Sequence, residues 1–261
     1  MDLLQKLETV EINHTSRISQ EDEQFCLNEQ HSYDEAWKAI DKAYKVINEL
    51  WSGSTLKERY IHTNDVISKI KEAKVNCGYN FIRAITQYFS KKYNVDFDYS
   101  KLDQKFSYQQ LITLDEVLDH LFAELGGFTF VEMANEQIKE KIKKSVYRFE
   151  VKKHTLHLPN FLYIEEWFES FKIFYQSKGK LEKLFDALML FENGSPIETN
   201  ALNQIKYEMG EGSKHHAIFE KYSFDIFRKI KSFKAFKNGK VSIEFHSMEF
   251  ANEFANTYLS K

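Results

Sequence analysis

The sequence is poor in glycine, proline and cysteine, and each shortage excludes a class of protein. Nine glycines and two prolines in 261 residues argue against a loop-rich scaffold and favour long regular elements. The two cysteines, Cys26 and Cys77, are too few and too far apart for a disulfide framework. We therefore expect two free thiols in a reducing compartment.

Long apolar runs are also missing. No stretch approaches the ~18 apolar residues that a membrane-spanning helix needs. The N-terminus lacks the basic and apolar segments of a secretory signal peptide. The sequence thus predicts a soluble, cytoplasmic protein with no membrane partner.

The chain has no large excess of either positive or negative charge. The 36 basic and 39 acidic residues leave a net charge of -3, so a nucleic acid can be met only by a local basic patch. Apolar and aromatic residues, in contrast, are plentiful, at 43% and 15% of the chain. They suffice for a substantial core in one large domain or two ordinary ones.

Changes in composition divide the chain into three regions, which together predict an α+β fold. Residues 1–31 form an acidic arm, which either docks on a basic partner or is a poorly ordered leader; the composition favours the leader. Residues 32–145 form a mainly helical region. Residues 146–261 form an α+β region with a C-terminal β-hairpin and a terminal helix.

Periodic apolar residues predict the helices of the second region. Three of them, at 33–51, 54–73 and 79–92, should pack as an antiparallel unit. Ser32 stands where it can cap the first helix, and Ser54 where it can cap the second.

Two further helices are expected before the composition changes. Thr113-Leu114-Asp115-Glu116 has the form of a capping box, so a helix should begin there and end at Gly126-Gly127. The next helix should run from about Phe130 to Ser145. Its basic end suits either the helix dipole or contact with phosphates.

The third region alternates between strand and helix patterns. Residues 146–158 alternate as one strand or as a hairpin, and residues 161–164 resume this alternation. Residues 165–176 are predicted to form an aromatic helix. A second helix, centred on 181–191, should stop at Asn193-Gly194.

The sharpest structural signal is a β-hairpin near the C-terminus. Two strand-like runs, 231–236 and 241–246, flank the dipeptide Asn238-Gly239. Asn-Gly favours a two-residue type I′ turn, because both turn positions need a positive φ. Apolar and polar residues alternate in the second run, so this strand should have one buried and one solvent-exposed face.

Few patterns in the chain point to catalysis. Glu150-Val151-Lys152 is the short half of the acid-x-lysine pattern of metal-dependent nucleases, in which the acid holds Mg²⁺ and the lysine stabilises developing charge. That pattern needs an upstream acid, for which Asp96, Asp98 and Asp115 qualify by their order in the chain alone. There is no glycine-rich phosphate loop and no nucleophile elbow. The sequence therefore predicts no cofactor and no metal site.

The strongest functional signal is a basic segment that overlaps the hairpin. From Lys214 to Lys240, eight basic residues face only Glu220 and Asp225. Such a segment can neutralise phosphates while its aromatic residues stack on bases, although most of these aromatics are expected in the core. Lysines on a hairpin edge also suppress edge-to-edge aggregation. The candidate phosphate-binding residues are Arg228, Lys229, Lys231, Lys234, Lys237 and Lys240.

Two stretches of the C-terminal region carry a family resemblance. Residues 184–197 form a helix followed by a Gly-x-Pro-Ile turn, and residues 236–245 form a Phe-Lys-x-Gly hairpin before the terminal helix; residues 149–153 add a fainter match. Over residues 180–258 the chain resembles an uncharacterised domain family of phages, plasmids and prophages, sometimes fused to adenine DNA methyltransferases. The resemblance implies a mobile-element setting and work on or near DNA. Because the chain has no methyltransferase cofactor motif, it would be an accessory part without the enzyme.

These observations predict a non-enzymatic nucleic-acid-associated module of a mobile genetic element, whose basic hairpin contacts phosphates. Two alternatives stay open. One is a protein-interaction or inhibitor protein that acts on a host defence or DNA-modification enzyme through the acidic arm. The other is a metal-dependent nuclease that uses Glu150 and Lys152. The partners to expect are accordingly DNA, or a host or mobile-element protein.

Overall fold

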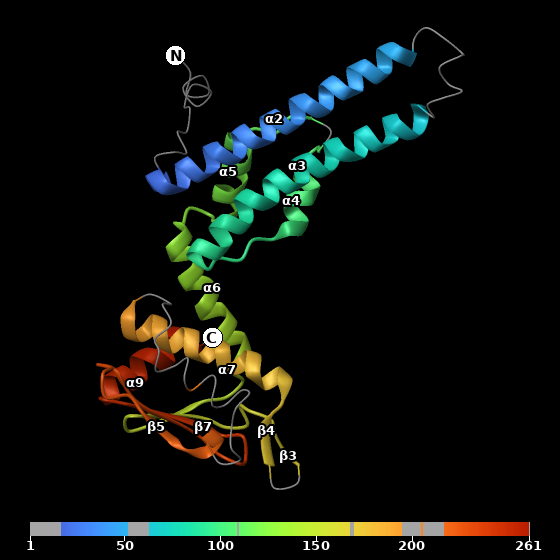
Figure 1. Cartoon of the computed structure of the whole chain (residues 1–261). Coiled ribbons are helices and arrows are strands. Elements are labelled where there is room, and N and C mark those ends of the chain that lie inside the picture. The colour runs from blue at the N-terminus through green and yellow to red at the C-terminus, as the bar shows by residue number, and fades with distance from the viewer. Residues whose placement is uncertain are drawn as a thin grey trace, which may run out of the picture. The chain divides into compact units, whose positions relative to one another are not determined.

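The fold has two compact units, residues 1–133 and residues 134–261. In this computed structural model the described residues are 17–51, 63–108, 110–167, 170–194, 205 and 217–260. The first unit is helical, and the second combines helices with an antiparallel sheet (Figure 1). The predicted α+β order, from helices to strands to a terminal helix, is confirmed.

Two long antiparallel helices, α2 (Gln20–Trp51) and α3 (Thr63–Tyr93), form the frame of the first unit (Figure 1). The predicted start at Ser32 is wrong, because Ser19 and Asp22 cap the helix earlier. Ser19 N donates to Asp22 Oδ2 at 3.0 Å, and Asp22 N donates to Ser19 Oγ at 3.2 Å. Ser32 lies inside α2, where its hydroxyl donates to the Asn28 carbonyl at 2.9 Å.

The predicted break between the second and third helices is also absent. α3 runs without interruption through Gly78, which is buried. A Cβ at this position would lie 3.3 Å from a methyl carbon of Ile112, so the glycine allows a close approach inside a continuous helix. The predicted cap at Ser54 lies outside the described residues.

Part of the predicted acidic arm belongs to this helical unit. Asp22 is fully buried and accepts hydrogen bonds from the Tyr88 and Tyr93 hydroxyls at 2.9 and 2.6 Å, and from Lys92 Nζ at 2.7 Å. Burial alone would raise the pKa of this carboxyl, but the hydrogen bonds from Lys92, Ser19 and Tyr93 hold the pKa well below its usual range. Residues 20–31 are therefore helix, while residues 1–16 lie outside the described residues.

Three shorter helices complete the helical part of the chain: α4 (Tyr99–Lys105), α5 (Leu114–Glu124) and α6 (Phe130–Ser145). The capping box is confirmed at α5, where Thr113 N donates to Glu116 Oε2 at 2.8 Å and Glu116 N donates to Thr113 Oγ1 at 3.3 Å. Gly126 and Gly127 follow with positive φ, as expected after a helix end. The bounds of α6 match the prediction.

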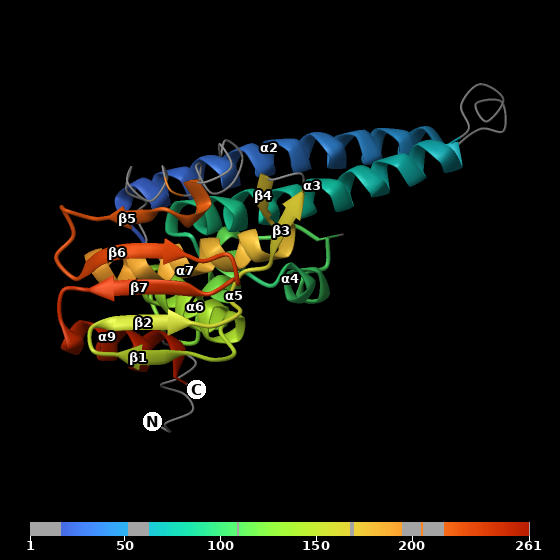
Figure 2. The same cartoon turned by 90° about the horizontal axis from the view of Figure 1, so that it is seen from below.

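The second unit is built on a five-stranded antiparallel sheet in the order β1-β2-β7-β6-β5, which Figure 2 shows face-on. Its strands are β1 (Glu150–Lys152), β2 (Thr155–Leu158), β5 (Lys221–Ser223), β6 (Ile230–Ala235) and β7 (Val241–Phe245). β1 and β2 form the hairpin that was one of the two predicted alternatives. β2 then pairs with β7, so segments far apart in sequence become neighbours.

The predicted aromatic helix at 165–176 is wrong. This segment contains a separate hairpin of β3 (Ile164–Trp167) and β4 (Ser170–Ile173). Phe171 and Ile173 are buried while Lys172 between them is exposed, which is the two-residue period of a strand. The helix that follows, α7 (Tyr175–Asn193), ends as predicted at Gly194, which has a left-handed φ of 72°.

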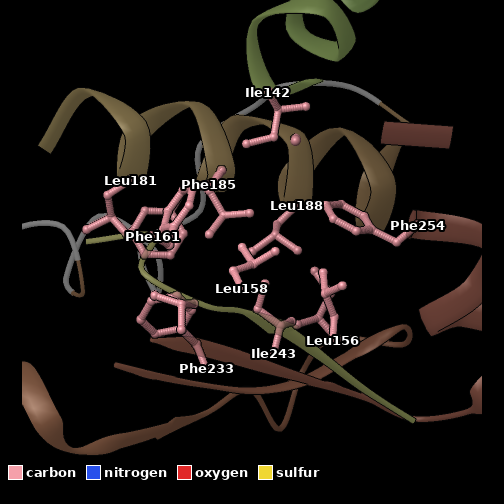
Figure 3. Packing of buried hydrophobic residues seen from close by; sticks show 14 of the residues in the cluster. Ile142, Leu156, Leu158, Phe161, Leu181, Phe185, Leu188, Phe233, Ile243 and Phe254 are labelled. Carbon is pink, nitrogen blue, oxygen red and sulfur yellow. The ribbon is translucent and has the colours of Figure 1, made fainter. Parts of the chain in front are cut away.

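Helices cover one face of the five-stranded sheet. In Figure 3, Phe185 and Leu188 from α7 point toward Leu156, Phe233 and Ile243 from the sheet, and all five are fully buried. The terminal helix α9 (Met248–Phe254), its π-helical continuation Ala255–Leu259, the short 3-10 helix Ala217–Phe219 and the end of α6 add to this core. The alternation predicted for β7 is confirmed, with every second residue buried.

The turn of the C-terminal hairpin differs from the predicted type I′. Gly239 has a positive φ of 75°, but Asn238 does not. Gly239 N donates to Phe236 O at 2.8 Å and Phe236 N donates to Lys240 O at 2.9 Å, so the turn precedes a bulged glycine. Leu162 N donates to Gly239 O at 2.9 Å, and a Cβ on Gly239 would lie 2.0 Å from Leu162 O. This contact with a distant segment selects the turn.

Candidate nucleic-acid interface

Alternate residues of the five strands place polar side chains on the face of the sheet opposite the core. The strand register aligns them in two rows: Glu150, His157, Ser242, Lys234 and Lys221, then Lys152, Thr155, Glu244, Ser232 and Ser223. We call these residues, together with Lys231, the open face; Figure 2 looks onto it. The side chains of Lys152, Lys221 and Lys231 are 64%, 51% and 50% exposed, so this face is accessible.

Glu244 on β7 is the centre of the open face. Its carboxylate accepts hydrogen bonds from Lys221 Nζ and Lys231 Nζ, both at 2.7 Å, and from Ser232 Oγ at 3.0 Å. His154 Nε2 lies 3.3 Å from the same carboxylate. The bonds from Lys221 and Lys231 hold the pKa of Glu244 well below its usual range, so the group is ionised at neutral pH.

A β-bulge brings Lys231 to this carboxylate. Ile230 pairs with Phe245 and Ser232 pairs with Glu244, which leaves Lys231 as the extra residue on β6. As a result, Lys231 is exposed, whereas the next two residues, Ser232 and Phe233, are both buried. The bulge was not predicted from the sequence, because residues 231–236 form one strand-like run there.

Further basic residues surround the far end of β6 and β7. Lys234 Nζ and Lys240 Nζ each lie 5.3 Å from the ring centre of Phe236, which is partly buried. His157 accepts from or donates to Ser242 Oγ at 2.8 Å. Burial, followed by the positive charges of Lys240 and Lys152, lowers the pKa of His157, so this imidazole is neutral at pH 7.

The other three candidate residues have different surroundings. Lys229 Nζ donates to the Phe191 carbonyl at 2.9 Å and lies 4.2 Å from the Phe191 ring centre, so it caps the C-terminal end of α7. Lys237 lies 4.5 Å from the ring centre of Phe171 and has an exposed position in the hairpin turn. The Arg228 side chain is exposed beside the sheet.

Glu192, which the sequence analysis did not single out, holds the segment that carries Arg228 and Lys229. Its buried carboxylate accepts hydrogen bonds from the backbone N–H groups of Arg228, Lys229 and Ile230 at 2.6, 2.9 and 3.1 Å. These three donors lie next to the start of β6. The only local signal was an acidic residue at the end of a helix, where the helix dipole disfavours it.

Most aromatics of the basic segment belong to the core, as expected. Phe224, Phe227 and Phe233 are buried. Phe236 is partly buried between two lysines. The open face is therefore a charged surface, and base stacking on it is restricted to its edge.

The two residues of the nuclease alternative lie on the open face. Glu150 and Lys152 lie on the edge strand β1, where Lys152 Nζ is 3.0 Å from Glu150 Oε1. Each therefore pairs with the other. The upstream acids belong to the first compact unit, where Asp98 caps α4 and Asp115 lies in the first turn of α5. Among the residues that the structure describes, no three His, Cys, Asp or Glu side chains form a group that could hold a metal ion.

The basic end of α6 is partly neutralised within the helix. Lys139 Nζ lies 2.6 Å from Glu136 Oε1, and Lys144 Nζ lies 3.0 Å from Glu140 Oε2. Both are pairs between adjacent helical turns. These contacts favour a role in stabilising the helix over contact with phosphates.

Comparisons of the chain with protein-family models, with curated proteins and with solved structures found no match. In the part of the chain that the structure describes, no helix combines the length and apolar character required to cross a membrane. Function must therefore be inferred from the residues of the open face and their surroundings.

Proposed function

We propose that the chain is a nucleic-acid-binding module of a mobile genetic element that contacts phosphates through the open face and the adjoining hairpin turn. The observation that carries the proposal is the gathering of lysines from different strands on one exposed face. Lys152, Lys221, Lys231 and Lys234 come from β1, β5 and β6, and Lys240 adjoins them. Only Glu150 and Glu244 oppose them among the described residues of this face.

The spacing of the strands suits a phosphate backbone. Neighbouring strands lie about 4.8 Å apart, so Lys221 on β5 and Lys234 on β6, which are opposite each other in the register, form a short line of positive charge. Long lysine side chains can adapt to phosphates along such a line without reading base sequence. The net charge of -3 for the whole chain does not oppose this, because binding depends on the local potential.

Glu244 supports the proposal as an internal counterion. It holds Lys221 and Lys231 in place while no phosphate is bound, and both ammonium groups remain half exposed. An incoming phosphate can then share these ammonium groups with the carboxylate. Binding through such contacts weakens as the salt concentration rises, because counterions compete for the phosphates.

Reversing the charge of Lys231, Lys234 and Lys237 tests the proposal. We expect the triple Lys→Glu variant to lose retention of labelled duplex DNA, single-stranded DNA and RNA. Where residual binding is measurable, the slope of log affinity against log salt should shrink by about one for each lysine. The matched control reverses Lys42, Lys71 and Lys91, which are exposed on helices of the first unit and give the same change in net charge. Equal binding by wild type and the hairpin variant would contradict the proposal.

The two alternative functions have less support from the described residues. The acidic arm proposed to capture a protein contributes Asp22 to a buried network within the helical unit. Glu150 and Lys152 form an ion pair on an edge strand. The same binding experiment with added Mg²⁺ separates these functions, because cleavage of the labelled strand that Glu150→Ala abolishes would favour the nuclease.

A further inference from the structure

A cavity of about 520 Å³ lies beside the hairpin turn of the second unit. Its volume is within the range of small-molecule sites, about 300–1,000 Å³. The residues that line it come from the segment before β3, from the start of α7 and from the turn between β6 and β7. No sequence pattern indicated this cavity, because one of its walls, at Asn238, is far along the chain from the other two.

Two exposed aromatic rings face the cavity from adjacent walls. Tyr163 and Phe174 are 62% and 37% exposed, and their ring centres lie 5.5 Å apart at an interplanar angle of 88°. Their backbones are fixed: Phe174 N donates to Tyr163 O at 2.9 Å, and Tyr163 N donates to the buried Ser177 Oγ at 2.8 Å. Aromatic rings that are open to solvent on a fixed backbone are suited to stacking on a planar ligand. Because these two rings are nearly perpendicular, one planar ligand can stack on only one of them.

The polar residues of the cavity match the edge of a nucleobase. Asn160, Gln176 and Asn238 each carry an amide, and the side-chain oxygen of Asn238 already accepts a hydrogen bond from Lys240 N at 3.2 Å. Among the described lining residues, Lys180 is the one charged side chain and there is no carboxylate. The cavity thus combines π faces, planar hydrogen-bonding groups and a cation, and contains nothing that repels a phosphate.

The cavity also adjoins the basic surface. Asn238 lines it, and the same turn carries Lys237 and Lys240. Lys240 directly precedes Val241, which pairs with Leu158 at the end of β2, two residues before Asn160 of the cavity. A strand that follows the lysines of the open face therefore reaches the mouth of the cavity at the hairpin turn.

We propose that this cavity receives an unpaired base of a single-stranded nucleic acid. The base stacks on Tyr163, the more exposed of the two rings, the three amides hydrogen-bond its edge, and Lys180 contacts an adjoining phosphate. This inference rests on the proposed function and narrows it, because bases in a duplex are stacked and paired and cannot enter. The module is accordingly a single-strand binder, with duplex contacts limited to the phosphate-binding lysines.

The test compares single-stranded and duplex DNA of the same sequence, with one 2-aminopurine as a fluorescent base. We expect Tyr163→Ala to weaken single-strand binding by about 5- to 150-fold, the range for loss of one stacked base, and to leave duplex binding unchanged. Fluorescence quenching on binding should disappear in the same variant. Tyr163→Phe should restore both signals, since it keeps the ring. Tyr175→Ala is the matched control, because Tyr175 is 83% exposed and is not a lining residue of the cavity.

The outcomes separate this inference from the proposed function. If wild type binds single strand and duplex equally and Tyr163→Ala changes neither, the base-binding cavity is overturned and the phosphate-binding face stands. If Tyr175→Ala weakens binding as much as Tyr163→Ala, the cavity is again overturned, because any surface aromatic would serve. If wild type retains no nucleic acid at low salt, both proposals are overturned. Because Tyr163 is mostly exposed, an unchanged circular dichroism spectrum is expected for its variants.

Discussion

The two faces of the five-stranded sheet come from the same strands but have different roles. On the covered face Leu156, Phe233 and Ile243 are fully buried beneath α7. On the open face, the alternate positions of the same strands carry polar and charged side chains, among them Lys234 and Glu244. Because successive residues of a strand point to opposite faces, stability and charge are separated at the level of single residues.

Two glutamates sharpen this comparison. Glu192, beneath the sheet, is buried and accepts hydrogen bonds from three backbone N–H groups. Glu244, on the open face, accepts hydrogen bonds from two half-exposed lysines and a serine. One carboxylate fixes the chain, and the other sets the positions of the charges that a phosphate would meet. The comparison predicts large folding effects on the covered side and small ones on the open side.

The largest effect on folding is expected for Phe185→Ala. Phe185 is fully buried against Phe233, with ring centres 5.2 Å apart, and its loss leaves a cavity beneath the sheet. The free energy of unfolding should fall by about 3–5 kcal/mol, as measured by urea unfolding followed by circular dichroism. Lys234→Ala on the open face is the control, and it should lower the free energy of unfolding by much less. Similar decreases in the free energy of unfolding of the two variants would show that the two faces do not differ in their contribution to stability.

A smaller effect is expected for Glu192→Ala. The substitution leaves the N–H groups of Arg228, Lys229 and Ile230 without their acceptor, which should cost about 2–3 kcal/mol. Glu192→Gln keeps one acceptor oxygen, so it should lower the free energy of unfolding by less than Glu192→Ala does. Hydrogen exchange gives a direct measurement, since these three amides should exchange faster in the alanine variant. Unchanged exchange would show that Glu192 does not hold this segment.

The smallest effect on folding is expected for Glu244→Gln. Exposed ion pairs contribute little, so the free energy of unfolding at pH 7 should change by less than about 1 kcal/mol. Nucleic-acid binding should instead become tighter, because the substitution removes a negative charge and frees Lys221 and Lys231 for phosphates. Weaker binding in this variant would mean that Glu244 positions these lysines productively rather than competing with phosphates.

The pH dependence of stability tests the same residue. The pKa of Glu244 lies below its ordinary value of 4.5 in the folded protein, so near that pH the unfolded chain binds more protons. The contribution of Glu244 to stability is therefore complete above about pH 4.5 and is lost as the pH falls toward the lower folded pKa. Urea unfolding across this range should show a shallower loss for Glu244→Gln than for wild type.

Elements with a local cause were predictable from the sequence. The capping box at Thr113 and Glu116 sets the start of α5, and Gly194 stops α7, because in each case the residues that interact are a few positions apart. The alternation of β7 and the strands of the C-terminal hairpin followed in the same way. The early start of α2 also has a local signal, the Ser-x-x-Asp of Ser19 and Asp22, which indicates a helix cap upstream of the predicted one at Ser32.

The candidate site was predictable only in part. The basic residues of the hairpin could be listed from the sequence, but Lys229 is engaged by α7 and Lys231 by Glu244. Lys152 and Lys221 were not predicted to contact phosphates, since they join the open face only through the pairing of β1 with β2 and of β5 with β6. The cavity at Tyr163 and Phe174 has no signal in any one segment.

The sequence by itself determined the α+β order, the capped helices and the alternating strands, because these depend on residues that are neighbours along the chain. Tertiary structure alone decided the pairing of β2 with β7, the hairpin at β3 and β4, and the turn at Gly239 against Leu162. These features depend on which distant segments pack together to bury apolar side chains and satisfy backbone hydrogen bonds. A local sequence pattern does not determine that choice. The open face and the cavity beside the hairpin turn exist for the same reason.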